Sequence, residues 1–206
     1  MIAIVDYGFG NLRSVVQAIQ YVGEKNVVLA QTAQDIEQAD KIIFPGQGAM
    51  PDCLKELEKR HLKTALLHAL KQKPFLGICL GLQLLFEQSE EGNSPGLGIL
   101  KGKVWRFQPE QNPKKLLKIP HMGWNNVKQT QTHFLWQNIA PDARFYFVHS
   151  FYAQAQNADH ILGTTHYGVD FTSAVVFQNG VAVQFHPEKS AEDGLQFLKN
   201  FTLWQP

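Results

Sequence analysis

The feature that most constrains the fold of this chain is a cysteine that stands between two glycines at the end of an apolar run. Residues 75–78 form that run, and Gly77 and Gly81 lie two residues before and two residues after Cys79. Apolar residues over 82–86 follow in a pattern typical of a helix. A nucleophile on a sharp strand-to-helix turn sits in strained backbone, and its neighbours must lack bulk where strand and helix converge. The stretch predicts such a turn with the Cys79 thiol at its tip, although a packed, inert cysteine fits the same residues.

Strand and helix patterns alternate four times in the first ninety residues. Strands are expected over residues 2–5, 26–30, 41–44 and 74–78, and helices over 12–22, 32–39, 50–59 and 61–72. Thr32 and Asp35 have the spacing of a capping box. This alternation predicts an α/β fold with a parallel, doubly wound sheet. Gly8 and Gly10 do not open a dinucleotide-binding fingerprint, because Arg13 stands where its third glycine would be.

Two features fall at the carboxyl ends of these strands, where doubly wound sheets bind their ligands. Gly46, Gln47 and Gly48 follow the third strand, and Cys79 follows the fourth. Glycines allow backbone N–H groups to approach a ligand closely, which suits an oxyanion hole. A plain turn is the alternative for this loop.

The second half of the chain is expected to be rich in β-structure. Short alternating segments cover residues 98–107, 116–119, 145–149, 162–167, 173–177 and 181–185. The polar stretch 109–113 is expected to be a loop, and Asn179-Gly180 predicts a hairpin turn. Residues 123–126, Gly-Trp-Asn-Asn, are expected to form a turn that carries Trp124. Ser190 is expected to cap a closing helix. Residues 1–206 are expected to form a single domain.

Composition excludes several classes of function. The 206 residues carry a formal net charge of +1, so no electrostatic field attracts nucleic acid or an anionic membrane. The sequence has neither a basic N-terminal leader nor an apolar run near the roughly 18 residues of a membrane span, so a cytoplasmic protein is expected. The two cysteines, Cys53 and Cys79, favour a reducing compartment over a disulfide scaffold. Cys53 lies in a helical pattern and is expected to be structural.

A second reactive motif stands near the C-terminus, where the apolar run 181–185 leads into His186-Pro187-Glu188. If the strand continues, its period of two places His186 and Glu188 on the same side. An imidazole next to a carboxylate can serve as a general base, and a thiol with a pKa of about 8.5 needs such help at neutral pH. Cys79, His186 and Glu188 are therefore candidates for nucleophile, base and orienting acid. A histidine that only stabilises its own turn is the alternative.

These motifs together resemble the class I, or triad, glutamine amidotransferases. The features shared with the class are residues 45–48, 77–83 and 186–188. Within the class, the chain most resembles the glutaminase subunits of imidazole-glycerol-phosphate synthase. The features of that group are residues 6–11, 120–125 and 146–152, so the resemblance spans nearly the whole chain.

The resemblance implies a three-layer α/β fold of flavodoxin-like type, with a largely parallel central sheet and helices on both faces. It implies hydrolysis of L-glutamine through a Cys79 thioester, with ammonia passed to a TIM-barrel cyclase subunit in a heterodimer of histidine biosynthesis. No cofactor, metal, nucleic acid or membrane is implied. The residues that it assigns are Gly48 and Leu80 to the oxyanion hole, Gln83, Glu91, Ser150 and Phe151 to substrate binding, and Asn11, Trp124, Tyr146 and Lys189 to the partner interface. Gln47 replaces the small apolar residue expected at the third position of the oxyanion loop.

Three other functions compete with this one. The chain could be the glutaminase of another synthase, such as anthranilate or pyridoxal-phosphate synthase, but residues 120–125 favour imidazole-glycerol-phosphate synthase. A thiol hydrolase of α/β-hydrolase type requires the order nucleophile, acid, histidine, whereas Glu188 follows His186 here. A binding module without catalysis would not need Cys79, His186 and Glu188 together.

Overall fold

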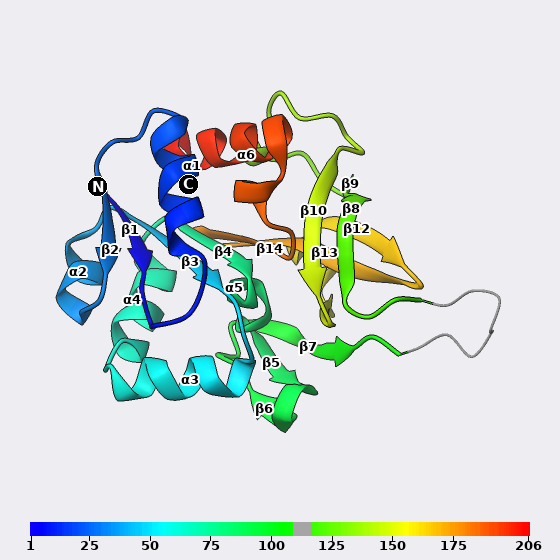
Figure 1. The fold of residues 1–206 in the computed structure, drawn as a ribbon, viewed down its shortest axis with the longest axis horizontal. Coiled ribbons are helices and arrows are strands. Elements are labelled where there is room, and N and C mark those ends of the chain that lie inside the picture. Colours follow the sequence, from blue (N-terminus) through cyan, green and yellow to red (C-terminus); the bar gives the residue numbers. More distant parts are fainter. Residues whose placement is uncertain (109–116) are drawn as a thin grey trace.

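The computed structural model describes residues 1–108 and 117–206 (Figure 1). Its strands are β1 (Ile2–Val5), β2 (Val27–Ala30), β3 (Lys41–Gly46), β4 (Phe75–Cys79), β5 (Phe86–Ser89), β6 (Ser94–Pro95), β7 (Leu100–Arg106), β8 (His121–Asn126), β9 (Lys128–Gln129), β10 (Arg144–His149), β11 (Phe151–Ala155), β12 (Ile161–Tyr167), β13 (Val169–Phe177) and β14 (Gly180–Val183). Its α-helices are α1 (Leu12–Tyr21), α2 (Ala33–Gln38), α3 (Met50–Lys59), α4 (Lys63–Gln72), α5 (Leu80–Gln83) and α6 (Ala191–Leu203). Short 3₁₀ turns are η1 (Glu91–Asn93), η2 (Phe134–Trp136), η3 (Ala158–His160) and η4 (Pro187–Lys189).

The central sheet is parallel in its first half and mostly antiparallel in its second. Its order is β2-β1-β3-β4-β14-β13-β11-β7-β5-β6, and the pairs from β2 to β14 are parallel. Strand β14 comes late in the sequence but lies beside β4, with Val183 opposite Ile78. The end of β14 is thereby brought next to Cys79, and the predicted α/β fold with its β-rich second half is confirmed.

Helices cover both faces of the parallel sheet because its strands are apolar on both sides. Along β1, Ala3 and Val5 belong to the cluster that packs against α2, α3 and α4. Ile2 and Ile4 belong to the cluster on the other face, with residues of α1 and α6. Figure 1 shows these two groups of helices on opposite sides of the sheet. The result is a three-layer molecule with the sheet between two layers of helices.

A separate two-stranded sheet, β8 and β10, packs over the α6 face of the antiparallel half. Its strands are antiparallel, with Trp124 opposite Tyr146 and His121 opposite His149. Phe145 and Phe147 point from β10 into the buried aromatic cluster, where both are fully buried. This sheet therefore forms a second wall beside the carboxyl ends of the parallel strands.

The structure corrects three predictions of secondary structure. The helix after Cys79 is a single turn, α5, because Phe86 is extended and pairs with Leu100 of β7. No strand covers residues 117–119, and pairing begins at His121, after Pro120, which has no N–H for a ladder. Trp124 lies in strand β8 and not in a turn. Residue 116 and the expected loop 109–113 lie outside the described residues.

Candidate active site

The Cys79 turn has the strained geometry that its glycines predict. Cys79 is the last residue of β4 and has φ 56° and ψ −104°, a conformation that L-residues rarely adopt. A Cβ at Gly77 would stand 2.6 Å from the Gly81 carbonyl oxygen, and one at Gly81 would collide with the Phe44 carbonyl. Glycine is therefore required on both sides of the thiol, because α5 crosses directly over β3 and β4.

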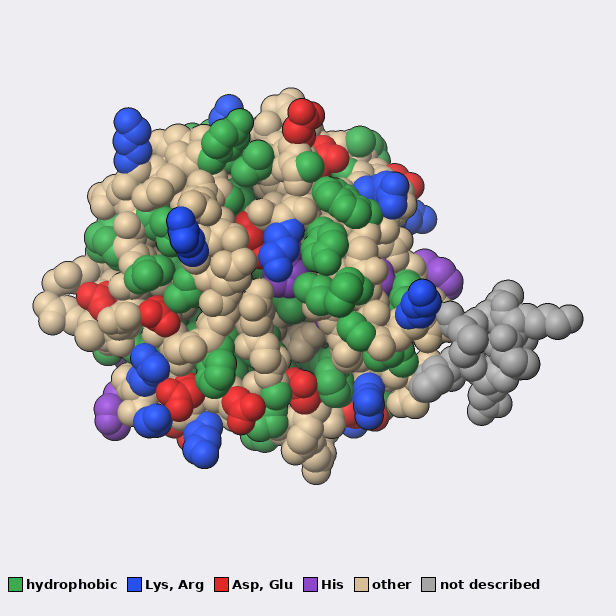
Figure 2. All heavy atoms as spheres, viewed as in Figure 1, with side chains coloured by type: hydrophobic (Ala, Val, Ile, Leu, Met, Phe, Trp, Pro, Cys, Tyr) green, Lys and Arg blue, Asp and Glu red, His purple; other side chains and the backbone are tan. Residues whose placement is uncertain are grey.

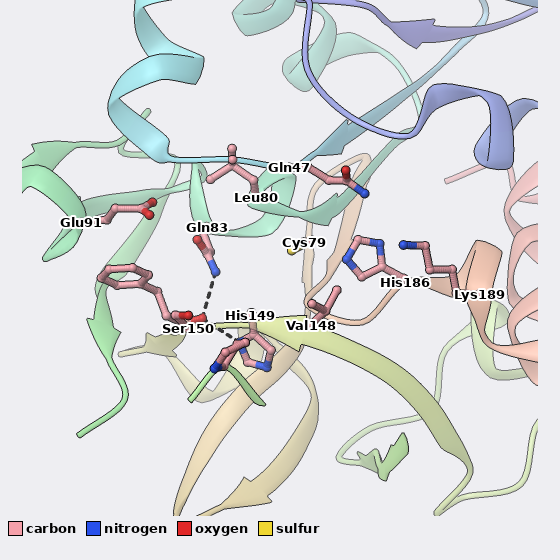
Figure 3. Close-up of a pocket in the computed structure, with 13 residues that line it drawn as sticks. Gln47, Cys79, Leu80, Gln83, Glu91, Val148, His149, Ser150, His186 and Lys189 are labelled. Carbon is pink, nitrogen blue, oxygen red and sulfur yellow. Dashed lines mark hydrogen bonds between the residues drawn. The ribbon is translucent and has the colours of Figure 1, made fainter. Parts of the chain in front are cut away.

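A cavity of about 490 Å³ opens at this turn and collects most of the predicted site residues (Figure 3). Its walls come from the β3 loop, α5, η1, β10, β11 and η4. The lining residues are Gln47, Gly48, Cys79, Leu80, Gln83, Glu91, Pro120, Val148, His149, Ser150, Phe151, His186 and Lys189. Residues distant in the sequence thus meet where the parallel sheet and the β8–β10 sheet face each other.

His186 faces the thiol and is held from behind by Glu188. Figure 3 shows the imidazole next to the Cys79 sulfur. His186 Nδ1 lies 2.8 Å from Glu188 Oε1, and both side chains are almost fully buried. His186 Nε2 has no hydrogen-bond partner within the described residues, so this nitrogen is available toward the cavity.

The way in which His186 and Glu188 meet differs from the prediction. Strand β14 ends at Val183, and residues 187–189 form the 3₁₀ turn η4, so a strand period does not align the two side chains. Ser190 also has another role, because its hydroxyl makes no capping bond to α6. It donates to the His186 carbonyl at 2.6 Å and accepts from Tyr146 N at 2.9 Å. These bonds tie η4 to β10 and fix the imidazole.

Electrostatics favour a protonated imidazole at this position. Burial lowers the pKa of His186, but the neighbouring Cys79 sulfur and the Glu188 carboxylate outweigh burial and raise that pKa to about 10. A sulfur next to an imidazole that a carboxylate holds in place is the arrangement of nucleophile, base and orienting acid. The other cysteine, Cys53, has no such partner role. It is buried in α3, and burial raises the pKa of its thiol to about 12.

Gln184 is a site residue that the sequence analysis missed. Its side chain is fully buried, and Nε2 donates to Cys79 Sγ at 3.5 Å. Gln184 Oε1 accepts from Gln83 Nε2 at 3.0 Å, and the same Gln83 nitrogen also donates to the Phe151 carbonyl at 3.0 Å. The available signal was one amide inside the apolar run 181–185. Since buried polar groups need partners, such an amide indicates a hydrogen-bonded site.

The predicted substrate residues lie together on the wall opposite His186 (Figure 3). Glu91 Oε2 accepts from Met50 N at 2.8 Å, and burial raises the pKa of this carboxyl. The oxyanion candidates Gly48 and Leu80 border the cavity next to Cys79, and Gly48 has φ 93°. A chain with a side chain at position 48 would be strained in this conformation.

The predicted interface residues are distributed over the rim and the adjoining surface. Lys189 lines the cavity, whereas Asn11 caps α1 through a 3.4 Å bond from Ser14 N to its side chain. Trp124 is 43% exposed and meets Tyr146 edge-on at 6.3 Å between ring centroids. Figure 2 shows hydrophobic side chains gathered over β8 and β10, while acidic and basic side chains are interspersed elsewhere on this face.

Neither a metal site nor a membrane span is present in residues 1–108 and 117–206. No group of three or more His, Cys, Asp or Glu side chains there is placed to hold a metal ion. None of the described helices is both long and apolar enough to cross a bilayer.

Comparison with known proteins connects this geometry to a family. The family model described as glutamine amidotransferase class-I matches residues 3–204. The imidazole glycerol phosphate synthase subunit HisH of Dechloromonas aromatica (strain RCB) is 54% identical over 209 residues, which cover 100% of this chain and 97% of that protein. The subunit of the same name from Nitrosospira multiformis is 52% identical over 211 residues, covering 100% of this chain and 98% of that protein.

Solved structures support the fold. The crystal structure of a glutamine amidotransferase superposes with a TM-score of 0.72 at 15% identity and covers 98% of both chains. A second glutamine amidotransferase, from Thermotoga maritima, gives a TM-score of 0.61 at 14% identity, covering 98% of this chain and 81% of that one. Because the family model matches residues 3–204, which include the Cys79 turn and the residues of the cavity, this chain belongs to the class-I glutamine amidotransferases.

Proposed function

We propose that this chain is the glutaminase subunit of imidazole glycerol phosphate synthase. It hydrolyses L-glutamine to glutamate and ammonia for a cyclase subunit in histidine biosynthesis, and it works in the cytoplasm. The observation that carries the proposal is identity of 50–54% over essentially the full length to several subunits of that name. The anthranilate and pyridoxal-phosphate alternatives have no comparable support among these relatives.

The proposed chemistry starts at the Cys79 sulfur. The thiolate attacks the carboxamide carbon of glutamine, and the C–N bond breaks as the His186 imidazolium gives its proton to the leaving nitrogen. Ammonia departs, and a thioester to Cys79 remains. His186, now neutral, takes a proton from water as the water attacks the thioester, which releases glutamate and restores the thiolate–imidazolium pair. Glu188 holds His186 through Nδ1 at 2.8 Å throughout.

The remaining cavity residues have separate roles in this scheme. Backbone N–H groups at Gly48 and Leu80 stabilise the oxyanion, a contribution that is typically worth a factor of about 10²–10³ in rate for each donor. Glu91 and Gln83 supply acceptor oxygens that suit the α-ammonium group of glutamine, and the backbone at Ser150 and Phe151 completes the substrate wall. The cavity of about 490 Å³ has ample room for one amino acid.

The cyclase partner is proposed to bind at the open side of the cavity. Ammonia must reach a second active site without escaping to water, so a lasting protein interface is expected there. Asn11, Trp124, Tyr146 and Lys189 form our candidate interface. Glycine at position 48 permits the oxyanion peptide to change orientation, and we therefore expect slow hydrolysis by the chain alone and activation when the cyclase binds its ligand.

The deciding experiment replaces the nucleophile. Cys79→Ala and Cys79→Ser should abolish glutamine hydrolysis in the presence of the cyclase while the fold and complex formation stay intact, because the turn accommodates a small side chain. Glutamate release and complex formation are measured on the same preparations, and Cys53→Ala serves as the matched control that keeps the reactive thiol. Measurable hydrolysis by Cys79→Ala would refute the assignment, and full activity of the chain without its partner would refute the gated oxyanion hole.

A further inference from the structure

Two buried histidines lie side by side in the second wall of the cavity and take no part in the chemistry described above. His121 on β8 is 3% exposed, and His149 on β10 is 6% exposed. The His121 ring is stacked between Tyr167, at 3.9 Å between centroids, and Phe147, at 4.8 Å. His149 meets Phe107 and Phe171 edge-on. Two polar rings inside an aromatic cluster are costly to bury unless each nitrogen is hydrogen-bonded.

The partners of His121 and His149 determine which nitrogen of each ring donates a hydrogen bond and which accepts one. His149 Nδ1 lies 2.7 Å from the Phe151 carbonyl, which only accepts, so Nδ1 carries the proton. A neutral His149 then accepts at Nε2, and His121 Nδ1 donates to it at 2.8 Å. His121 Nε2 must in turn accept, and Asn125 Nδ2 supplies that donor at 3.2 Å. Burial lowers the pKa of His121 to about 4 and that of His149 to about 3, which keeps both rings neutral.

The end of this chain of bonds is the Phe151 carbonyl, and that oxygen has a second partner. Gln83 Nε2 donates to it at 3.0 Å, and Gln83 also contacts Gln184, which reaches Cys79. One carbonyl oxygen therefore joins the histidine pair to the amide side chain that faces the substrate space.

We infer that His149, oriented by His121, is a positioning residue for glutamine binding. Its Nδ1–H fixes the Phe151 carbonyl, and the fixed carbonyl holds the Gln83 amide nitrogen, so that the Gln83 oxygen stays turned toward the substrate. The role of His121 is to donate to His149 Nε2, which keeps the proton of His149 on Nδ1. This inference rests on the proposed glutaminase function. It adds positioning roles for His121 and His149 and assigns the proton of His149 to Nδ1.

Two amide substitutions of His149 test whether the role of the side chain depends on Nδ1 or on the rest of the ring. The amide of Asn occupies the place of Nδ1, and the amide of Gln occupies the place of Nε2. His149→Asn therefore keeps the donor to Phe151, whereas His149→Gln loses it. We expect His149→Gln, in complex with the cyclase, to raise KM for glutamine about tenfold with a much smaller change in kcat, a change of about 1.4 kcal/mol that is the size of one hydrogen bond. His149→Asn should stay near the wild-type KM.

A second readout does not depend on turnover. Iodoacetamide should alkylate Cys79, and bound glutamine should protect it. His149→Gln should need about tenfold more glutamine than wild type for the same fractional protection. The matched control is His160→Gln, because His160 Nδ1 also donates to a backbone carbonyl, that of Val176 at 3.0 Å, outside the cavity. It should leave KM and protection unchanged.

The outcomes distinguish this inference from the proposed function. If wild-type complex hydrolyses no glutamine, the proposed function fails and this inference fails with it. If the wild type is active but the Asn and Gln variants behave alike, or if both lose thermal stability and kcat with KM unchanged, His149 only fills space and the inference is overturned.

Discussion

At the scale of single residues, the pairing of His186 with Glu188 makes the two side chains unequal in importance. Glu188 contacts only Nδ1, and the proton transfers use Nε2, so the loss of Glu188 leaves the base in place. We predict that His186→Ala lowers the rate of glutamine hydrolysis by about 10³–10⁴ and that Glu188→Ala lowers it less, by about 10². Steady-state assays of the complex measure both. Equal and negligible losses would mean that residues 186–188 are only a turn.

The raised pKa of His186 predicts a dependence of stability on pH. The unfolded imidazole titrates near 6.5 and the folded one near 10, so its stabilising effect is complete below pH 6.5 and is lost as pH rises toward 10. The difference in unfolding free energy between wild type and His186→Gln should therefore fall between these two values. Urea denaturation in a pH series measures it. A difference that is constant from pH 6 to pH 10 would show that the folded imidazole titrates normally.

Individual residues also show which features of the site could be predicted from the sequence and which could not. The need for glycine at Gly77 and Gly81 was predicted from the sharp turn at Cys79, although part of the crowding comes from Phe44, which is distant in sequence. The meeting of His186 and Glu188 was predicted with the wrong geometry, because η4 depends on Ser190 binding to β10. Gln184, His121 and His149 were missed because their function depends on partners that only the folded chain brings near.

At the scale of elements, the start of α2 is determined by residues close to each other in the sequence. Thr32 accepts from Asp35 N at 3.2 Å, and the Asp35 carboxylate accepts from Thr32 N at 2.8 Å, which is the predicted capping box. Thr32→Ala should destabilise the chain by about 1 kcal/mol, because it removes one of these two bonds. Chemical denaturation measures the change, and Thr32→Ser is the control that keeps the hydroxyl. An unchanged midpoint in Thr32→Ala would show that α2 is held by its packing alone.

Elements whose boundaries depend on distant pairing were predicted less well. The apolar spacing over 82–86 favours a helix, but β7 provides a partner for Phe86 and the chain extends. The sequence around Gly123 favours a turn, whereas six registered pairs with β10 hold β8 extended. The spacing of apolar residues predicts a helix or a turn correctly only where no strand from elsewhere in the sequence pairs with the same backbone.

At the scale of the whole molecule, the surface over β8 and β10 should bind the cyclase. Trp124 is 43% exposed and meets the Tyr146 ring edge-on, so a large part of its ring is open to a partner and lies outside the core. We predict that Trp124→Ala weakens complex formation or glutaminase activation roughly 30-fold, the effect of losing one hot-spot aromatic, while the melting temperature of the isolated chain barely changes. Titration with the cyclase and thermal unfolding are measured in parallel.

The control for this surface is another exposed aromatic. Tyr21 at the end of α1 is 79% exposed and lies on a different element, so Tyr21→Ala should leave binding of the cyclase unchanged. If Trp124→Ala instead loses several degrees of melting temperature and its folded fraction binds normally, Trp124 belongs to the core.

Strand β14 pairs with β4 although it comes about a hundred residues later in the sequence, and this order matters while the protein is being synthesised on the ribosome. Cys79 is synthesised 107 residues (186 − 79) before His186, and β4 gains its β14 neighbour only after residue 183 emerges. At typical synthesis rates of about 5–20 residues per second, the nascent chain carries this thiol for several seconds without its base. Under the proposed mechanism, Cys79 becomes reactive only when the sheet is complete, so we expect an incomplete chain to release no ammonia.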